Sequence, residues 1–148
     1  MFKNYSIDKL TAVSYPEIIS VWEASVRATH DFLNEEDIRV YKSLINDQYF
    51  SQLQLFGVQG KKGEIEGFIG VQNAKIRLLF ILPASMGKGI GKALINYVYR
   101  HMNIKEVDVN EQNTSAFNFY TYLGFEVTDR SAADAIGKPF PVLSMELR

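Results

Sequence analysis

Apolar residues recur every three or four positions in four segments of the chain, a spacing that gathers them on one face of a helix. In the first segment Ile18, Trp22 and Val26 keep this spacing, with polar residues between them. The predicted helices are a segment that begins at Ser14 and reaches the ATHDFLN stretch, a segment that follows Asn34 and reaches Tyr49, and residues 90–101 and 113–123.

Seven shorter runs alternate between apolar and polar residues, or are apolar throughout, and predict strands. They are residues 5–10, 53–58, 64–72, 75–82, 104–110, 125–130 and 141–147. The run 75–82, KIRLLFIL, is almost wholly apolar, as is typical of a central strand covered on both faces, and Pro83 ends it. Gly60 and Gly63 separate the second and third runs, which therefore predict a hairpin.

Capping residues mark the starts of the first two helices. Ser14, Pro16 and Glu17 predict a capping box, in which Ser14 is the N-cap and Glu17 returns a hydrogen bond to it. Asn34 is suited to cap the second helix, because its side-chain oxygen can accept from a free backbone N–H. Two helices should therefore precede the main sheet.

The order of the predicted elements is strand, two helices, three strands, helix, strand, helix and two strands. Hairpins mixed with strand–helix–strand crossovers indicate a mixed sheet with helices on both sides. We expect an α/β (α+β) fold in a single domain spanning residues 1–148, with a central sheet of about six to seven strands and about four flanking helices.

Charge and composition exclude several classes of function. The chain has 16 Lys and Arg against 17 Asp and Glu, so it has no positive field and we expect no nucleic-acid partner. It has no cysteine, which excludes a disulfide, a thiolate zinc site and a cysteine nucleophile. No apolar run approaches the roughly 20 residues of a membrane helix, and the N-terminus lacks a signal-peptide core. We expect a cytoplasmic protein with no membrane partner.

A glycine-rich loop, GKGIGKAL, follows the apolar strand and opens the third helix. Glycines let a backbone approach a ligand closely, and a helix start points free N–H groups at an anion, so the loop predicts a phosphate site. It is not a Walker A loop, because Met86 stands where that motif needs glycine and Ala93 offers no hydroxyl. It is not a dinucleotide fingerprint, because Gly91 comes one residue early.

Together the segments LLFILPASMGKGIGKALI and NEQNTSAFNFYTYLGFEV resemble the GCN5-related N-acetyltransferases, first in the family's glycine loop and then in its Asn, Tyr and Gly-Phe segment. The resemblance implies acetyl-CoA as cofactor, with its pyrophosphate on the loop and its pantetheine arm along the preceding strand. It implies the following cofactor contacts: Leu79, Phe80, Ile81, Gly87, Lys88, Gly89, Ile90, Gly91, Lys92 and Asn113. Met86 departs from the family, which has Gln or Arg at this position.

The resemblance also implies the acid of the reaction. Tyr120 matches the family's general acid, which protonates the departing coenzyme thiolate. The neighbouring Phe117, Phe119 and Tyr122 are interpreted as aromatic residues that pack the helix on the sheet. Asn113 also suits a plain helix cap, and the two roles are compatible.

Two residues compete as base, the group that takes the proton from the amine. Alternation over residues 105–110 places Asp108 on the face opposite Val107 and Val109, where some family members carry a carboxylate facing the cleft. His30 is the rival, because THDFL lies where the family admits the acceptor and imidazole titrates near neutrality. His30 and Phe32 are our candidates for substrate binding.

The acceptor is expected to be a primary amine: a protein lysine, a protein N-terminus or a small molecule. An alternative is a non-catalytic acyl-CoA-binding or regulatory module of the same fold, which Met86 favours and which Tyr120 and Asn113 oppose. A homodimer through edge-strand pairing near PFPVLSMEL is a further possibility.

Overall fold

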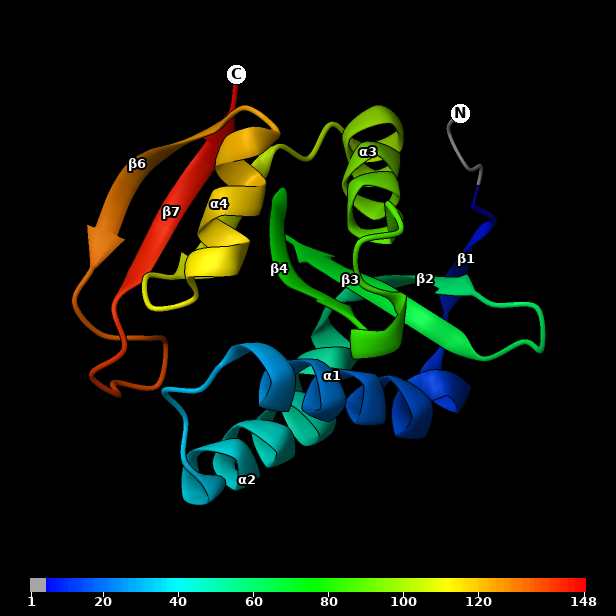
Figure 1. The fold of residues 1–148 in the computed structure, drawn as a ribbon, viewed down its shortest axis with the longest axis horizontal. Coiled ribbons are helices and arrows are strands. Elements are labelled where there is room, and N and C mark those ends of the chain that lie inside the picture. Colours follow the sequence, from blue (N-terminus) through cyan, green and yellow to red (C-terminus); the bar gives the residue numbers. More distant parts are fainter. Residues whose placement is uncertain (1–4) are drawn as a thin grey trace.

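Within residues 5–148, seven strands pair into one mixed sheet with the order β1-β2-β3-β4-β5-β7-β6. Figure 1 shows the fold. The computed structural model describes residues 5–148. The strands are β1 (Ile7–Leu10), β2 (Gln54–Gln59), β3 (Ile65–Gln72), β4 (Lys75–Ile81), β5 (Glu106–Asn110), β6 (Phe125–Ser131) and β7 (Val142–Leu147). The pairing is antiparallel except between β4 and β5, as expected for a sheet that mixes hairpins with a crossover.

In the described part of the chain, four α-helices connect the strands in the predicted order. They are α1 (Tyr15–Thr29), α2 (Glu35–Leu44), α3 (Ile90–Met102) and α4 (Thr114–Tyr122). The second helix is shorter than its apolar pattern predicts, because after Leu44 the chain widens into one π-helical turn, η2 (Ile45–Tyr49). The mixed sheet and the four helices confirm the predicted fold class.

The two faces of the sheet carry separate apolar cores. α1, α2 and η2 cover one face through a core that includes Ile18, Trp22 and Phe50. α3 and α4 cover the other face through a core that includes Leu94 and Tyr120. Figure 1 shows α1 and α2 on the side of the sheet away from α3 and α4. Alternation along the strands sends successive side chains into different cores, which explains why β3 is apolar at almost every position.

Of the caps predicted for the first two helices, only the one at Asn34 forms. The Asn34 side chain accepts from Asp37 N–H at 2.8 Å, and the Asp37 carboxylate accepts from Asn34 N–H at 3.2 Å, so this cap is a complete capping box. The capping box at Ser14 is wrong. The Ser14 side chain makes no cap bond, and the Glu17 carboxylate accepts from Ile65 N–H at 2.8 Å, which ties α1 to the start of β3.

The last strand lies inside the sheet and not at its edge. β7 pairs with β5 on one side and with β6 on the other, so its backbone groups are already used. The suggested dimer through the PFPVLSMEL segment is therefore wrong, because the outer strands are β1 and β6. Within residues 5–148, no helix has both the length and the apolar character needed to cross a membrane.

Candidate functional site

The parallel strands β4 and β5 separate soon after they meet. They pair only at Lys75 with Glu106 and at Ile76 with Val107. The next residue, Arg77, has no opposite residue on β3, since Gly70 pairs with Leu78 and Val71 with Ile76. An extra residue of this kind is a β-bulge, which bends its strand. The bulge therefore accounts for the divergence of β4 from β5.

Two hollows open around the diverging strands. The loop hollow, of about 310 Å³, lies beside the glycine loop and the start of α3. The wide hollow, of about 650 Å³, lies between α1, α2 and the β6–β7 segment. The two hollows share five lining residues: His30, Leu79, Phe80, Asn113 and Ala116. The site therefore has two compartments with a common boundary, which suits a reaction between two bound molecules.

The glycine loop has the geometry that a phosphate group needs. Gly87 and Gly89 have φ angles of 78° and 85°, which L side chains rarely adopt, and a Cβ on either would meet no atom within 4 Å. Gly89 is the N-cap of α3, so no side chain occupies the first N–H groups of the helix. The first turn of α3 contains no acidic residue that would repel an anion. The loop hollow therefore fits a diphosphate.

The other residues predicted to contact the cofactor differ in whether they line the loop hollow and in which of their atoms a ligand can reach. Leu79, Phe80 and Ile81 line the loop hollow from β4, where the strand has lost its β5 partner. Lys92 borders the hollow and Lys88 does not. The Ile90 side chain is fully buried in the core, so only its backbone is available to a ligand.

Met86 and two residues of α3 and α4 complete the loop hollow. Met86 is 39% exposed and lines the hollow where the resembling family has Gln or Arg. Phe119 lines it from α4, and a Cβ on Gly91 would approach the Phe119 ring to 3.2 Å, so Gly91 allows the two helices to pack closely. Phe119 was interpreted as a packing residue only, but it also forms part of the wall of the loop hollow.

Tyr120 is 4% exposed and lines neither hollow; it lies one turn beyond Ala116, which lines both, on the same face of α4. Its ring packs edge-on against Phe119 and Phe125, and burial raises the pKa of its hydroxyl, so Tyr120 is protonated at neutral pH. Among residues 5–148 no buried side-chain nitrogen or oxygen lacks a hydrogen-bond partner. Tyr122 is 85% exposed, so the expectation that it packs on the sheet is wrong.

Asp108 faces the wide hollow, as the alternation of β5 predicts. Lys75 Nζ lies 3.1 Å from its Oδ1, and Arg77 lies 3.5 Å from its Oδ2. The Ser144 hydroxyl of β7 donates to the same Oδ1 at 2.9 Å. The alternation of β5 predicts the carboxylate but not these partners, because Lys75 and Arg77 come from β4 and Ser144 from β7, which are distant in sequence from Asp108.

His30 and Phe32 lie at different depths in the site. His30, 8% exposed, is at the boundary of both hollows, and its Nε2 is 3.4 Å from Asn113 Nδ2. Phe32 lines neither hollow. Its ring packs 5.3 Å from that of His30 and 5.6 Å from that of Phe140, both of which line the wide hollow. Phe32 therefore supports the wall behind His30 and Phe140 without lining it, and its part in substrate binding stays a prediction.

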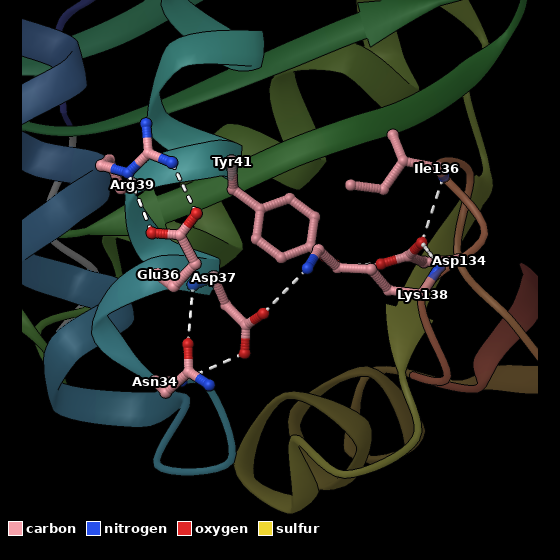
Figure 2. A network of polar contacts seen from close by, with 8 residues as sticks. All are labelled: Asn34, Glu36, Asp37, Arg39, Tyr41, Asp134, Ile136 and Lys138. Atoms are coloured by element: carbon pink, nitrogen blue, oxygen red, sulfur yellow. Dashed lines mark hydrogen bonds and ion pairs between the residues drawn. The ribbon is translucent and has the colours of Figure 1, made fainter.

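A polar clasp closes one wall of the wide hollow, and sequence analysis missed it. Lys138 Nζ lies 3.0 Å from Asp37 Oδ1, and the Tyr41 hydroxyl donates to Asp134, so α2 is joined to the β6–β7 segment (Figure 2). The other Asp134 oxygen accepts from the N–H groups of Ile136 and Lys138. The partners are 93 and 101 residues apart, and no local motif indicates such a contact.

Curated relatives cover most of this chain. It is 36% identical over 129 residues to the peptidyl-lysine N-acetyltransferase YjaB of Salmonella typhimurium, covering 87% of this chain and 88% of that protein. It is 33% identical to the protein of the same name from Escherichia coli, covering 87% of each. The solution structure of apo YjaB from Escherichia coli superposes with a TM-score of 0.86, at 31% identity and 97% coverage of both chains.

The fold is shared more widely, and a family model covers the site. An N-acetyltransferase PaiA from Thermoplasma acidophilum, solved with coenzyme A, has a TM-score of 0.73 at 22% identity, covering 97% of this chain and 99% of that one. The model of the acetyltransferase (GNAT) domain matches residues 27–147, which include most of the residues that line the two hollows. The chain therefore belongs to the GNAT acetyltransferase family and is an acetyl-CoA-dependent N-acetyltransferase.

Proposed function

We propose that the chain transfers the acetyl group to the side-chain amine of lysine residues in proteins. The observation that carries the proposal is the wide hollow, which is open, borders the loop hollow and combines apolar walls with carboxylates. Trp22, Tyr49 and Phe140 offer apolar surface to the four-carbon stem of a lysine, and Asp134 offers negative charge to its ammonium. The charge of Asp108 is already matched by Lys75 and Arg77. The names of the relatives from Salmonella and Escherichia coli support the same acceptor.

In this proposal the loop hollow holds acetyl-CoA, which supplies an activated acetyl thioester. The N–H groups of the loop and of the first turn of α3 hold the pyrophosphate. The main chain of Leu79–Ile81 pairs with the pantetheine arm as a further strand, on the side that β5 has left. Each contact comes from the backbone, so it does not depend on the side chain of Met86.

Proton transfers are assigned to two side chains. Tyr120 keeps its proton at neutral pH and donates it to the leaving sulfur, which restores the coenzyme thiol. Asp108 accepts the proton of the lysine ammonium through water in the wide hollow, where it lies. Asp108 lines the wide hollow, whereas Tyr120 lies one helical turn beyond Ala116 and lines neither hollow.

The test is an acetyl-transfer screen that follows thiol release. Three acceptors are compared: a peptide with one internal lysine and a blocked N-terminus, a peptide with a free N-terminus and no lysine, and a short alkyl diamine. We expect turnover with the lysine peptide, at a kcat/KM at least about tenfold above that of the other two, and a mass increase of one acetyl group. Preference for the free N-terminus or the diamine would contradict the lysine assignment.

Asp108→Asn tests the base in the same assay. It keeps the shape of the side chain and removes its ability to take a proton, so kcat/KM for the lysine peptide should fall by about 10²-fold or more. Affinity for acetyl-CoA should stay unchanged, because Asp108 is not among the residues that line the loop hollow. If Asp108→Asn kept the wild-type turnover, water alone would take the proton of the lysine ammonium and Asp108 would not be the base.

A further inference from the structure

His30 is the residue at which α1 ends, and its side chain lines both hollows. Its backbone N–H still bonds to Val26 O at 2.8 Å, as in the helix, while its φ and ψ of −111° and 66° leave the helical region. The ring is enclosed by Phe32 at 5.3 Å and Phe80 at 6.3 Å. The backbone turn therefore directs a buried imidazole toward the start of α4.

The hydrogen bonds around the ring assign its protons. Asn113 Oδ1 accepts from Ala116 N–H at 3.1 Å, which leaves the Asn113 amide nitrogen facing His30 Nε2 at 3.4 Å. An amide nitrogen only donates, so Nε2 must accept, and the ring proton resides on Nδ1. Nδ1 then donates to Thr29 Oγ1 at 2.8 Å, and that hydroxyl donates to Ser25 O at 2.8 Å.

This arrangement argues against His30 as the base of the reaction. The lone pair of Nε2 is occupied by Asn113, and Nδ1 carries a proton. Burial lowers the pKa of the ring to about 4, although the nearby Asp31 charge acts in the opposite direction. A ring with no free lone pair and so low a pKa does not take a proton from an ammonium at neutral pH.

We propose that His30 is a positioning residue, which holds the Asn113 side chain in the one orientation that both caps α4 and faces the two hollows. Asn113, Ala116 and Tyr120 follow each other on one face of α4, so the direction of this helix start sets where Tyr120 lies. His30 thus joins the acceptor side of the molecule to the helix that carries the acid. The inference rests on the proposed function.

The experiment is a double-mutant cycle between His30 and Asn113, with two readouts. His30→Phe keeps a ring of similar shape and removes the acceptor, and His30→Gln returns a carbonyl oxygen near the Nε2 position. Asn113→Ala removes the other partner. Calorimetry gives the dissociation constant of acetyl-CoA, and thiol release with the lysine peptide gives kcat and KM.

We expect His30→Phe to weaken acetyl-CoA binding about fivefold, through loss of one hydrogen bond, and to lower kcat more than it changes KM for the peptide. His30→Gln should return both values to within about threefold of the wild type. In the Asn113→Ala background, His30→Phe should have no further effect, because the group that it positions is already gone.

Other results overturn the inference. If His30→Phe kept the wild-type affinity and kcat while His30→Gln lost them, the ring would act through packing alone. Equal losses with and without Asn113 would mean that His30 acts on the substrates directly. The affinity cycle needs no acceptor, so failure of the lysine peptide to react would count against the proposed function, and absence of coupling in the affinity cycle would count against the positioning role.

Discussion

The hydroxyl of Tyr5 donates a hydrogen bond of 2.5 Å to the carbonyl oxygen of Lys88, joining the start of the described chain to the glycine loop. That carbonyl shares a peptide unit with the N–H of Gly89, and in a planar trans peptide the two groups point in opposite directions. By holding the carbonyl on one side, Tyr5 turns the Gly89 N–H to the other. A distant side chain thus orients a backbone donor of the glycine loop.

Tyr5→Phe should therefore weaken acetyl-CoA binding about fivefold, which corresponds to roughly 1 kcal/mol for one hydrogen bond. Calorimetric titration with acetyl-CoA measures the change. Tyr99→Phe is the matched control, since Tyr99 lies on the outer side of α3 and is 44% exposed. An unchanged affinity in Tyr5→Phe would show that the loop keeps its orientation without this bond.

Gly89→Val should abolish the thermal stabilisation that acetyl-CoA gives to the protein, about 2.7 kcal/mol at a hundredfold excess over the dissociation constant. Gly63→Val is the control, because Gly63 has nearly the same φ, 82° against 85°, and equally open space around its Cβ. Both variants should lose similar stability without ligand, through strain at positive φ. If acetyl-CoA still raised the melting temperature of Gly89→Val, the pyrophosphate would not bind at this loop.

Tyr120→Phe deletes only the hydroxyl of a buried ring, so the fold should survive. If Tyr120 donates the proton to the leaving sulfur, kcat should fall by about 10²- to 10⁴-fold, while the acetyl-CoA dissociation constant changes little. Tyr122→Phe, at a side chain that is 85% exposed, should be nearly neutral. Steady-state assays of the two variants with one accepted amine measure the difference. Equal turnover in both would show that Tyr120 is not the general acid.

Met86→Arg should strengthen acetyl-CoA binding about tenfold, because a guanidinium at the rim of the loop hollow can form charge-assisted hydrogen bonds to phosphate. Met86→Leu keeps an apolar side chain there and should leave the affinity as it is. Titration of both variants at two salt concentrations checks the cause, since the gain in the arginine variant should shrink as salt screens the charge. A gain that is equal for Leu and Arg would show that the charge is not responsible.

Acid should destabilise the protein through His30. The imidazole has a pKa of about 4 in the folded chain and 6.5 as its ordinary value, so the unfolded chain binds more protons between these two pH values. The stability that this group contributes is complete above pH 6.5 and is lost as the pH falls to about 4, by at most about 3 kcal/mol. Urea unfolding at pH 7.0, 5.5 and 4.5 measures the loss.

His30→Phe cannot take up this proton, so its stability should fall less than that of the wild type over the same pH range. The difference between the two curves isolates His30 from the carboxylates that also titrate in acid. Parallel curves for the two proteins would show that His30 titrates alike in the folded and unfolded chains.

Local patterns in the sequence were enough to predict the elements and the glycine-rich start of α3. The helix and strand periodicities gave the order of all seven strands and four helices, because side-chain direction follows from backbone geometry within a few residues. The loop was predictable for the same reason, since Gly87, Gly89 and the start of α3 are contiguous in the chain.

Contacts between distant residues were decided only by the tertiary structure. The hydrogen bond between His30 and Asn113 spans 83 residues, and the ion pair between Asp37 and Lys138 spans 101. Glu17 has the spacing of a capping box, yet its carboxylate bonds to β3 instead. Such partners are chosen by how helices pack on the two faces of the sheet, which no periodicity within one element specifies. The wide hollow was unpredictable for this reason: its walls meet only after α1, α2 and the β6–β7 segment have packed together.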